Sequence, residues 1–172
     1  MRGLTQAGTS AAGITVLTFS IITFGLGIAR ANPGANDATR VALHAIMRNC
    51  DFSLTGTAPT IPSPMLGTGW AEVHAAESRA VGAVHLVAPN EPGVHYNVGI
   101  IEEPRPVSAT CGPGDPGTTF GGFDTDAAGV GTATVTDSVR PGTTGVWVII
   151  ERPNPNSQNP AEYYTSEFVV PV

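Results

Sequence analysis

Short segments in which apolar and polar residues alternate fill the chain from Trp70 to its last residue. Successive side chains on a β-strand point to opposite faces, so alternation of this kind predicts half-buried strands. Turn-forming stretches such as ESR at 77–79 and PNEPG at 89–93 separate the segments. The predicted strands cover residues 70–76, 80–88, 94–102, 118–125, 130–139, 144–152 and 163–172. The pattern predicts a mainly β domain, an immunoglobulin-like antiparallel β-sandwich.

The segment before Trp70 carries a different pattern. Residues 36–49 begin with a helix-capping residue, Asn36 or Asp37, and continue with an apolar stripe at helical spacing formed by Val41, Ala42, Ala45 and Ile46. We therefore expect a short N-terminal helix, with an irregular first strand as the alternative. A short strand over 50–56 and a proline-broken connector over 57–69 follow. We expect residues 32–69 to pack with residues 70–172 as one domain.

The first 31 residues have the parts of a secretory signal peptide. Arg2 supplies a positive charge, an apolar run covers 14–28, and the small-x-small sequence ARA ends at Ala31. A membrane anchor is the alternative, but the apolar run is shorter than the roughly 20 residues that span a bilayer. We expect cleavage after Ala31, an exported protein, and no stable membrane span in the mature chain.

Two cysteines, Cys50 and Cys111, follow the predicted cleavage site. In an oxidising compartment an isolated pair most simply forms one disulfide. A reactive thiol pair is the alternative, and it is disfavoured because neither cysteine belongs to a C-x-x-C motif.

The predicted mature chain is strongly acidic. It contains no lysine, and its six arginines face fourteen acidic residues, which gives a net charge of −8 with histidine neutral. Such a surface repels phosphate backbones and anionic lipids, so nucleic acid is excluded as an expected partner.

The alternating pattern also predicts which side chains share a face of the sheet. Pairing 70–76 with 80–88 so that Ala76 is opposite Val81, and then 80–88 with 94–102, gives one apolar face that should form the core. Its members are Ala71, Val73, Val84, Leu86, Tyr96 and Val98. The opposite face then aligns Glu72, His85 and Asn97 across three neighbouring strands, about 5 Å apart.

This row of a carboxylate, an imidazole and an amide is the candidate binding face for a partner or small ligand. His74 lies diagonal to His85 in the same pairing, so Glu72, His74 and His85 form the alternative, a transition-metal site. Outer faces of half-exposed sheets also carry polar residues without any function. Apart from this possible metal, the sequence predicts no cofactor. A small apolar ligand held between the helix and the sheets is a third hypothesis.

The stretch GGFDTDAAGVGTATV at 121–135 resembles the start of a calcium loop, with Asp124 and Asp126 two positions apart. A calcium loop of the EF-hand kind also needs a distal glutamate and flanking helices, and both are missing here. A β-hairpin that joins the predicted strands over 118–125 and 130–139 explains more residues, since Gly129 can adopt a positive φ and Val130 begins the next strand. We therefore expect the aspartates to stabilise a turn.

No complete catalytic motif is present, so the sequence predicts no catalytic residue. It has no G-x-S-x-G motif, which a serine hydrolase of the α/β kind would carry. Glu102 and Glu103 are adjacent, so on a strand their carboxylates would point to opposite faces and could not act together as in a glycosidase.

Four segments carry a resemblance to a known group of proteins: 48–54, 125–135, 142–150 and 163–169. Together they resemble small exported proteins of mycobacteria and related actinobacteria, which have a β-sandwich-like domain and no established activity. The resemblance implies export and supplies no catalytic residue. We therefore expect a secreted or cell-envelope binding protein without catalytic activity, whose partner is a protein or envelope component. A metal-binding protein or metal-dependent enzyme is the alternative.

Overall fold

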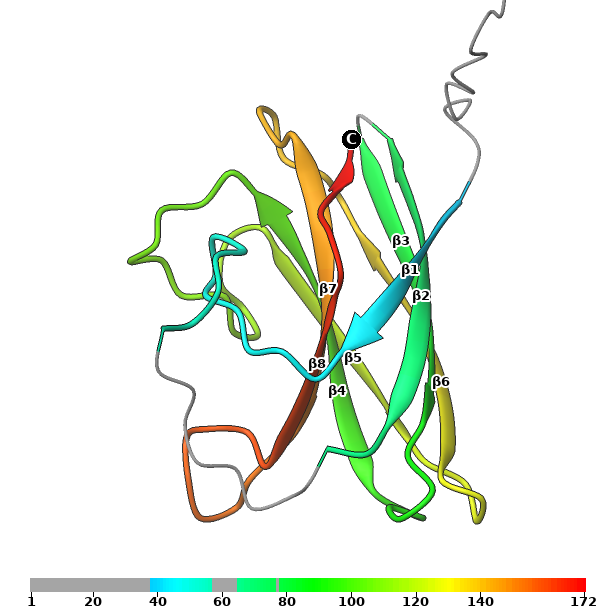
Figure 1. Ribbon diagram of the computed structural model, residues 1–172. Coiled ribbons are helices and arrows are strands. Elements are labelled where there is room, and N and C mark those ends of the chain that lie inside the picture. The colour runs from blue at the N-terminus through cyan, green and yellow to red at the C-terminus, as the bar shows by residue number, and fades with distance from the viewer. Residues whose placement is uncertain (1–37, 57–64, 77) are drawn as a thin grey trace, which may run out of the picture. The chain divides into compact units, whose positions relative to one another are not determined.

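The computed structural model describes residues 38–56, 65–76 and 78–172 (Figure 1). The predicted signal peptide lies outside the described residues, as do the helix-capping residues Asn36 and Asp37 and most of the proline-broken connector. The strands are β1 Thr39–His44, β2 Thr68–Ala76, β3 Arg79–Val87, β4 His95–Glu103, β5 Thr118–Asp124, β6 Val130–Asp137, β7 Gly145–Arg152, β8 Glu162–Ser166 and β9 Val170–Pro171. The prediction of a mainly β, antiparallel fold is confirmed.

The nine strands form one nearly closed antiparallel sheet (Figure 1). Their order is β5–β4–β7–β8–β1–β2–β3–β6, and β9 pairs with β7 beyond the end of β8. The terminal strands β5 and β6 approach each other without a continuous ladder. At one end Asp126 N–H donates to the Val130 carbonyl over 2.8 Å, and at the other the Thr119 hydroxyl donates to Asp137 over 2.7 Å. The division into two immunoglobulin-like sheets stays a prediction, because pairing joins all the strands.

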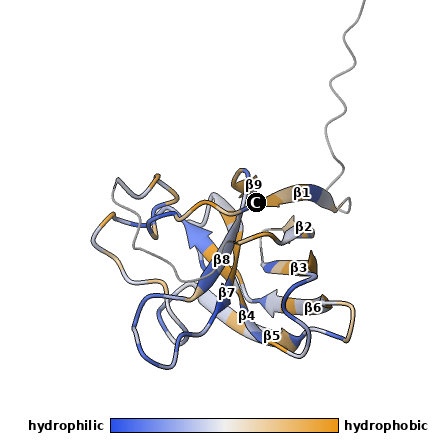
Figure 2. Ribbon diagram, turned by 60° about the horizontal axis from the view of Figure 1, so that its bottom comes forward, coloured by the Kyte–Doolittle hydropathy of each residue, from blue (hydrophilic) through white to orange (hydrophobic). Residues whose placement is uncertain are grey.

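The core lies inside this nearly closed sheet. The apolar face expected from the alternation is confirmed, because all six of its residues are buried: Ala71, Val73, Val84, Leu86, Tyr96 and Val98. The same cluster also contains Val41, Ile100, Val148 and Ile150 from β1, β4 and β7. Figure 2 shows β1, β2, β3 and β6 side by side, with hydrophobic and hydrophilic segments alternating along the strands.

The predicted N-terminal helix is wrong, and no helix occurs in the described part of the chain. Residues 39–44 form β1, which pairs with β2 along one edge and with β8 along the other. Val41 and Leu43 point into the core two residues apart, and that burial decides the conformation. The predicted strand over 50–56 is also wrong: the segment turns, and a single bridge joins Arg48 to Leu54.

The predicted β2–β3 hairpin is confirmed. The predicted residue pairs within it are wrong, and so is the predicted pairing of β3 with β4. Ala76 is opposite Arg79, not Val81, a shift of two residues that leaves each side chain on its expected face. Strand β3 then pairs with β6 and not with β4. The linking segment crosses to the β5–β6 turn, where Ala88 N–H donates to the Gly129 carbonyl over 2.8 Å. The residues 89–93 therefore connect non-neighbouring strands.

A lobe of two loops, 45–56 and 104–117, covers the outer face of β4 and β7. The predicted disulfide is confirmed: Cys50 and Cys111 join the loops with a Cα–Cα distance of 5.5 Å. Phe52, Cys111 and Phe120 pack on the outward side chains of Ile101, Trp147 and Ile149, which form a second apolar cluster. In Figure 1 the two loops project together from the same side of the sheet.

Candidate functional site

Two of the three residues predicted to form a binding face lie together, and the third lies elsewhere. Trp70 is opposite His85 in the β2–β3 hairpin, and Glu72 is opposite Ala83. Glu72 and His85 are therefore diagonal neighbours and line the same hollow. Asn97 lies on β4, which pairs with β5 and β7. The predicted row across three neighbouring strands does not form, because β6 takes the place beside β3 that the prediction gave to β4.

The histidines are spread over the domain. His74 is opposite Val81 and is not among the residues that line the hollow with Glu72 and His85. His95 Nδ1 lies 2.8 Å from an Asp124 carboxylate oxygen on the neighbouring strand. Among residues 38–56, 65–76 and 78–172, no three His, Cys, Asp or Glu side chains are arranged to hold a metal ion. The pairing therefore does not gather Glu72, His74 and His85 into the set that a metal site would require.

The outer face does carry a stacked cluster that the sequence analysis missed. The rings of Trp70 and His85 stack with centroids 4.0 Å apart and an interplanar angle of 27°. The guanidinium of Arg40 lies 4.2 Å from the centre of the Trp70 ring. Arg40 comes from β1 and His85 from β3, the two strands that flank β2. We call these three residues the Trp70 cluster; it holds the indole in place while leaving part of it exposed.

An open hollow of about 540 Å³ lies beside the Trp70 cluster. Ala83 on β3 is one of the residues that line it. Trp70, Glu72 and His85 line one part of it, and Thr132 and Thr134 from β6 line another. The hollow thus combines an aromatic wall, a carboxylate and two hydroxyl groups, which can receive a polar side chain or small ligand.

A second hollow, which we call the disulfide groove, lies between the lobe and the outer face of β7 and β8. Its volume is about 500 Å³. Its lining includes both cysteines, Met47, Arg48, Ala109, Thr110, Gly112, Ile149, Glu151, Gln158, Asn159, Pro160, Tyr163 and Thr165. Glu151 is the carboxylate of this groove, and it is half-buried. Asn97 is directly opposite Glu151 in the β4–β7 pairing, so this predicted site residue belongs near the second hollow.

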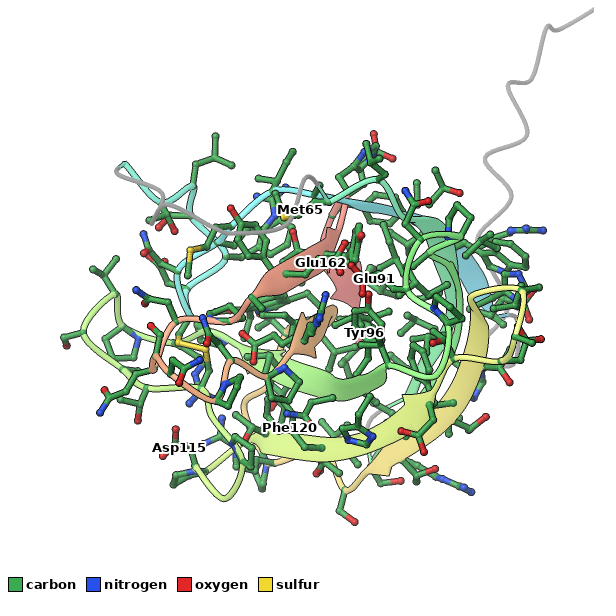
Figure 3. All side chains as sticks on the ribbon, turned by 90° about the horizontal axis from the view of Figure 1, so that it is seen from below. Met65, Glu91, Tyr96, Asp115, Phe120 and Glu162 are labelled. Carbon is green, nitrogen blue, oxygen red and sulfur yellow. A yellow bond between two sulfur atoms is a disulfide. The ribbon has the colours of Figure 1, made fainter. Side chains whose placement is uncertain are left out.

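The interior contains a polar centre at the end of the sheet that Figure 3 views. The buried carboxylate of Glu162 accepts hydrogen bonds from the hydroxyls of Tyr96, over 2.6 Å, and Tyr164. Burial and these bonds raise the pKa of both tyrosines well above the usual value of 10. Figure 3 shows Glu162, Tyr96 and Glu91 close together. Glu91 pairs with Arg152 over 2.7 Å, and the cavity between Glu91 and Glu162 holds only about 50 Å³.

Glu102 and Glu103 point to opposite sides of β4, as predicted. Glu102 is fully buried and bonds Arg140 and Thr143. Burial alone would raise the pKa of Glu102, but the bonds to Arg140 and Thr143 hold it below its usual value. Glu103 instead accepts a 2.9 Å hydrogen bond from the Trp147 indole. Both carboxylates are therefore engaged in structural contacts.

The stretch 121–135 forms the predicted turn, but the predicted hairpin is wrong, because β5 and β6 lie at the two ends of the strand order and share no continuous ladder. Of the two aspartates, Asp126 bonds amides of the turn, whereas the Asp124 carboxylate lies beside His95 Nδ1. One Asp126 carboxylate oxygen accepts hydrogen bonds from the N–H groups of Ala128, over 2.8 Å, and Val130, over 2.9 Å. Gly129 has a φ of 75°, a left-handed conformation that favours glycine. The Asp126 side chain thus satisfies amides of its own turn.

Comparison with protein-family models, with curated proteins and with solved structures gave no match to this chain. In the part of the chain that the structure describes, no helix is long and apolar enough to cross a membrane.

Proposed function

We propose that this chain is an exported, non-catalytic binding protein of the cell envelope or extracellular space, and that it binds a protein partner through the Trp70 cluster. The signal-peptide pattern at residues 1–31 supports export. A disulfide that joins two surface loops is typical of an oxidising compartment. The resemblance to small exported mycobacterial and actinobacterial proteins agrees with this location.

The observation that carries the proposal is the partly exposed indole of Trp70 held between neighbours from two strands. Tryptophan and arginine are enriched among the residues that dominate protein–protein binding energy. Because Arg40 and His85 already restrict the Trp70 ring, a partner would spend little entropy on ordering it. The hollow above Ala83 lies next to the ring and can receive a side chain of the partner.

The architecture that we propose is immunoglobulin-like. The neighbours β2–β3–β6 correspond to strands A–B–E of such a sandwich, and β5–β4–β7–β8 correspond to C′–C–F–G. Strand β1 would then be an addition that pairs with both edges, A and G. In this interpretation the Trp70 cluster lies on the outer face of the A–B–E sheet, at its junction with the added strand.

Site-specific photo-crosslinking in the producing cell tests the proposed surface. A photoreactive amino acid at Thr134, beside the hollow, should give a covalent protein adduct in the envelope or secreted fraction. The same amino acid at Ala127, an exposed position in the β5–β6 turn, should not give this adduct. Trp70→Ala and His85→Ala should each reduce the adduct at Thr134 by about tenfold or more, since dominant contacts contribute at least about 2 kcal/mol.

Three results would contradict the proposal. One is an adduct at Thr134 that persists in folded Trp70→Ala and His85→Ala variants. Another is equal labelling at Ala127. The third is a protein that stays in the cytoplasm with its first 31 residues attached, which would remove the proposed location. Thermal unfolding of each variant shows that loss of the adduct is not loss of fold.

A further inference from the structure

The disulfide groove contains a carboxylate that forms no ion pair with any of the described residues. Within the described residues, burial is the sole contribution that shifts the pKa of Glu151, and it raises that pKa. The nearest strand neighbours are Asn97 on β4 and Tyr163 on β8, neither of which is charged at neutral pH. Arg152, the next residue along β7, is paired with Glu91. Glu151 is therefore half-buried and has no partner cation in the part of the chain that the structure describes.

The arginine that lines the same groove is also engaged elsewhere. Arg48 donates to the carbonyl oxygens of Phe52, over 3.1 Å, and Glu167, over 3.3 Å. Its guanidinium also lies 3.8 Å from the centre of the Phe52 ring. These contacts fix Arg48 at the lobe, so it does not neutralise Glu151.

The walls of the groove suit an apolar stem that ends in a cationic head. Met47, Ile149 and the disulfide supply apolar surface, and Glu151 supplies the charge. Gln158 and Asn159 line the same groove and offer amide oxygens as further acceptors. The volume of about 500 Å³ is within the range of small-ligand sites, roughly 300–1,000 Å³. An ammonium head would pair with Glu151 and recover the free energy lost on burying this carboxylate.

We propose that the disulfide groove binds a primary ammonium group on an apolar stem, with Glu151 as its counter-ion. This site is separate from the Trp70 cluster and does not depend on the proposed function. The chain contains no lysine, so none of its own side chains supplies a competing primary ammonium group. The shared chemistry can come from a lysine side chain of another protein or from a free alkyl amine.

NMR titration of the mature, disulfide-bonded protein with n-butylammonium tests the proposal. Saturable shifts should appear at the amides of Thr110, Ile149 and Asn159, which line the groove. n-Butanol has the same stem without the charge and should give a response at least tenfold weaker. Equal responses to the two probes, or shifts confined to another surface, would overturn the proposal.

Variants of Glu151 separate the ion pair from the shape of the groove. Glu151→Gln keeps the size and removes the charge, so it should weaken n-butylammonium binding by tenfold or more. Glu151→Asp keeps the charge and should retain measurable binding. The matched control is Glu167→Gln, an exposed carboxylate whose loss should leave the affinity unchanged. Unchanged affinity in folded Glu151→Gln would refute the assignment; Trp70→Ala should have no effect.

Two further probes distinguish the sources of the ammonium group. Nα-acetyl-lysine N-methylamide represents a lysine side chain in a polypeptide, and 1,4-diaminobutane represents a free amine. The lysine side chain carries its ammonium group on the same four-carbon stem as n-butylammonium, so the lysine derivative should bind about as tightly. Binding of the diamine alone would restrict the site to free amines, and binding of neither would overturn the proposal.

Discussion

The hydroxyl of Tyr96 on β4 donates a 2.6 Å hydrogen bond to the carboxylate of Glu162 on β8, inside the sheet. Strand β7 lies between these two strands, so the bond ties together elements that are not paired. Glu162 is almost completely buried, and Tyr164 supplies its second hydroxyl donor. The two donors offset the cost of burying this carboxylate.

Tyr96→Phe should therefore destabilise the domain markedly. The substitution leaves the aromatic ring in place and removes one donor from a buried carboxylate, a loss of about 1.5–3 kcal/mol in the free energy of unfolding. Tyr163→Phe is the matched control, because Tyr163 lies on the opposite face of β8 and its hydroxyl bonds no group in the described residues. Urea unfolding monitored by circular dichroism measures both variants; equal losses would show that the Glu162 bond contributes nothing specific.

The sequence allowed the core face to be predicted but not the neighbours of each strand. Alternation fixes which side chains point inward whatever strand lies alongside, so Val84 and Tyr96 are buried as expected although β3 and β4 do not pair. The shift of two residues in the β2–β3 hairpin preserves faces for the same reason. A predicted site that spans strands needs correct neighbours as well, and for this reason Asn97 was separated from Glu72 and His85.

The remaining errors have local causes. In residues 39–46 the apolar positions fit both a helical stripe and a strand, and the deciding partners lie far away in sequence on β2 and β8. Nothing near Glu151 in the sequence indicates that residues 158–160 and the disulfide lobe will enclose it. The stacking of Trp70 on His85 likewise depends on the hairpin register. The Asp126 turn was predictable because all its contacts lie within a few residues.

Glu151 should make the stability of the domain depend on pH. Its pKa in the folded protein is raised above the ordinary 4.5 by burial, so the folded state holds this proton more tightly than the unfolded state. Well below pH 4.5 the Glu151 carboxyl is protonated in both the folded and the unfolded state, so it does not change the free energy of unfolding. As the pH rises through 4.5 towards the folded pKa, the carboxyl ionises more readily in the unfolded state, and the free energy of unfolding falls. The cationic side chains on the elements around Glu151 are Arg48, which lines the groove, and Arg152, the next residue on β7.

Glu151→Gln should consequently unfold at the same urea concentration as the parent protein near pH 3 and at a higher one at pH 7. Guanidine is avoided in this experiment because its cation would bind the site under study. Glu167→Gln, at an exposed position, serves again as the control and should show no such divergence. If Glu151→Gln is less stable than the parent protein at pH 7, the carboxylate has a stabilising partner and this prediction is wrong.

Removing the disulfide should destabilise the lobe and the domain together. Cys50 and Cys111 are 61 residues apart, and a cross-link over a loop of that length contributes about 4 kcal/mol in the chain-entropy model. The Cys50→Ser/Cys111→Ser double variant should also expose Trp147, which contacts Phe52 of the lobe with ring centroids 5.6 Å apart. A red shift of its fluorescence, measured in a Trp70→Phe background, would report this exposure. An unshifted spectrum would show that the lobe packs without its cross-link.

Gly129 and Gly142 allow two causes of glycine preference to be measured separately. Both have a positive φ, 75° and 89°, so alanine at either position adopts an unfavourable backbone conformation. At Gly142 a new Cβ would meet no atom within 4 Å, whereas at Gly129 it would lie 2.1 Å from the Ala88 carbonyl oxygen.

Gly142→Ala should therefore lower the free energy of unfolding by about 1 kcal/mol, the penalty for the left-handed conformation. Gly129→Ala should lower the free energy of unfolding by clearly more than Gly142→Ala does, because it also disrupts the hydrogen bond from the Ala88 N–H to the Gly129 carbonyl. Urea unfolding compares the two, and equal costs would mean that the β5–β6 turn can move away from the segment that leads from β3 to β4.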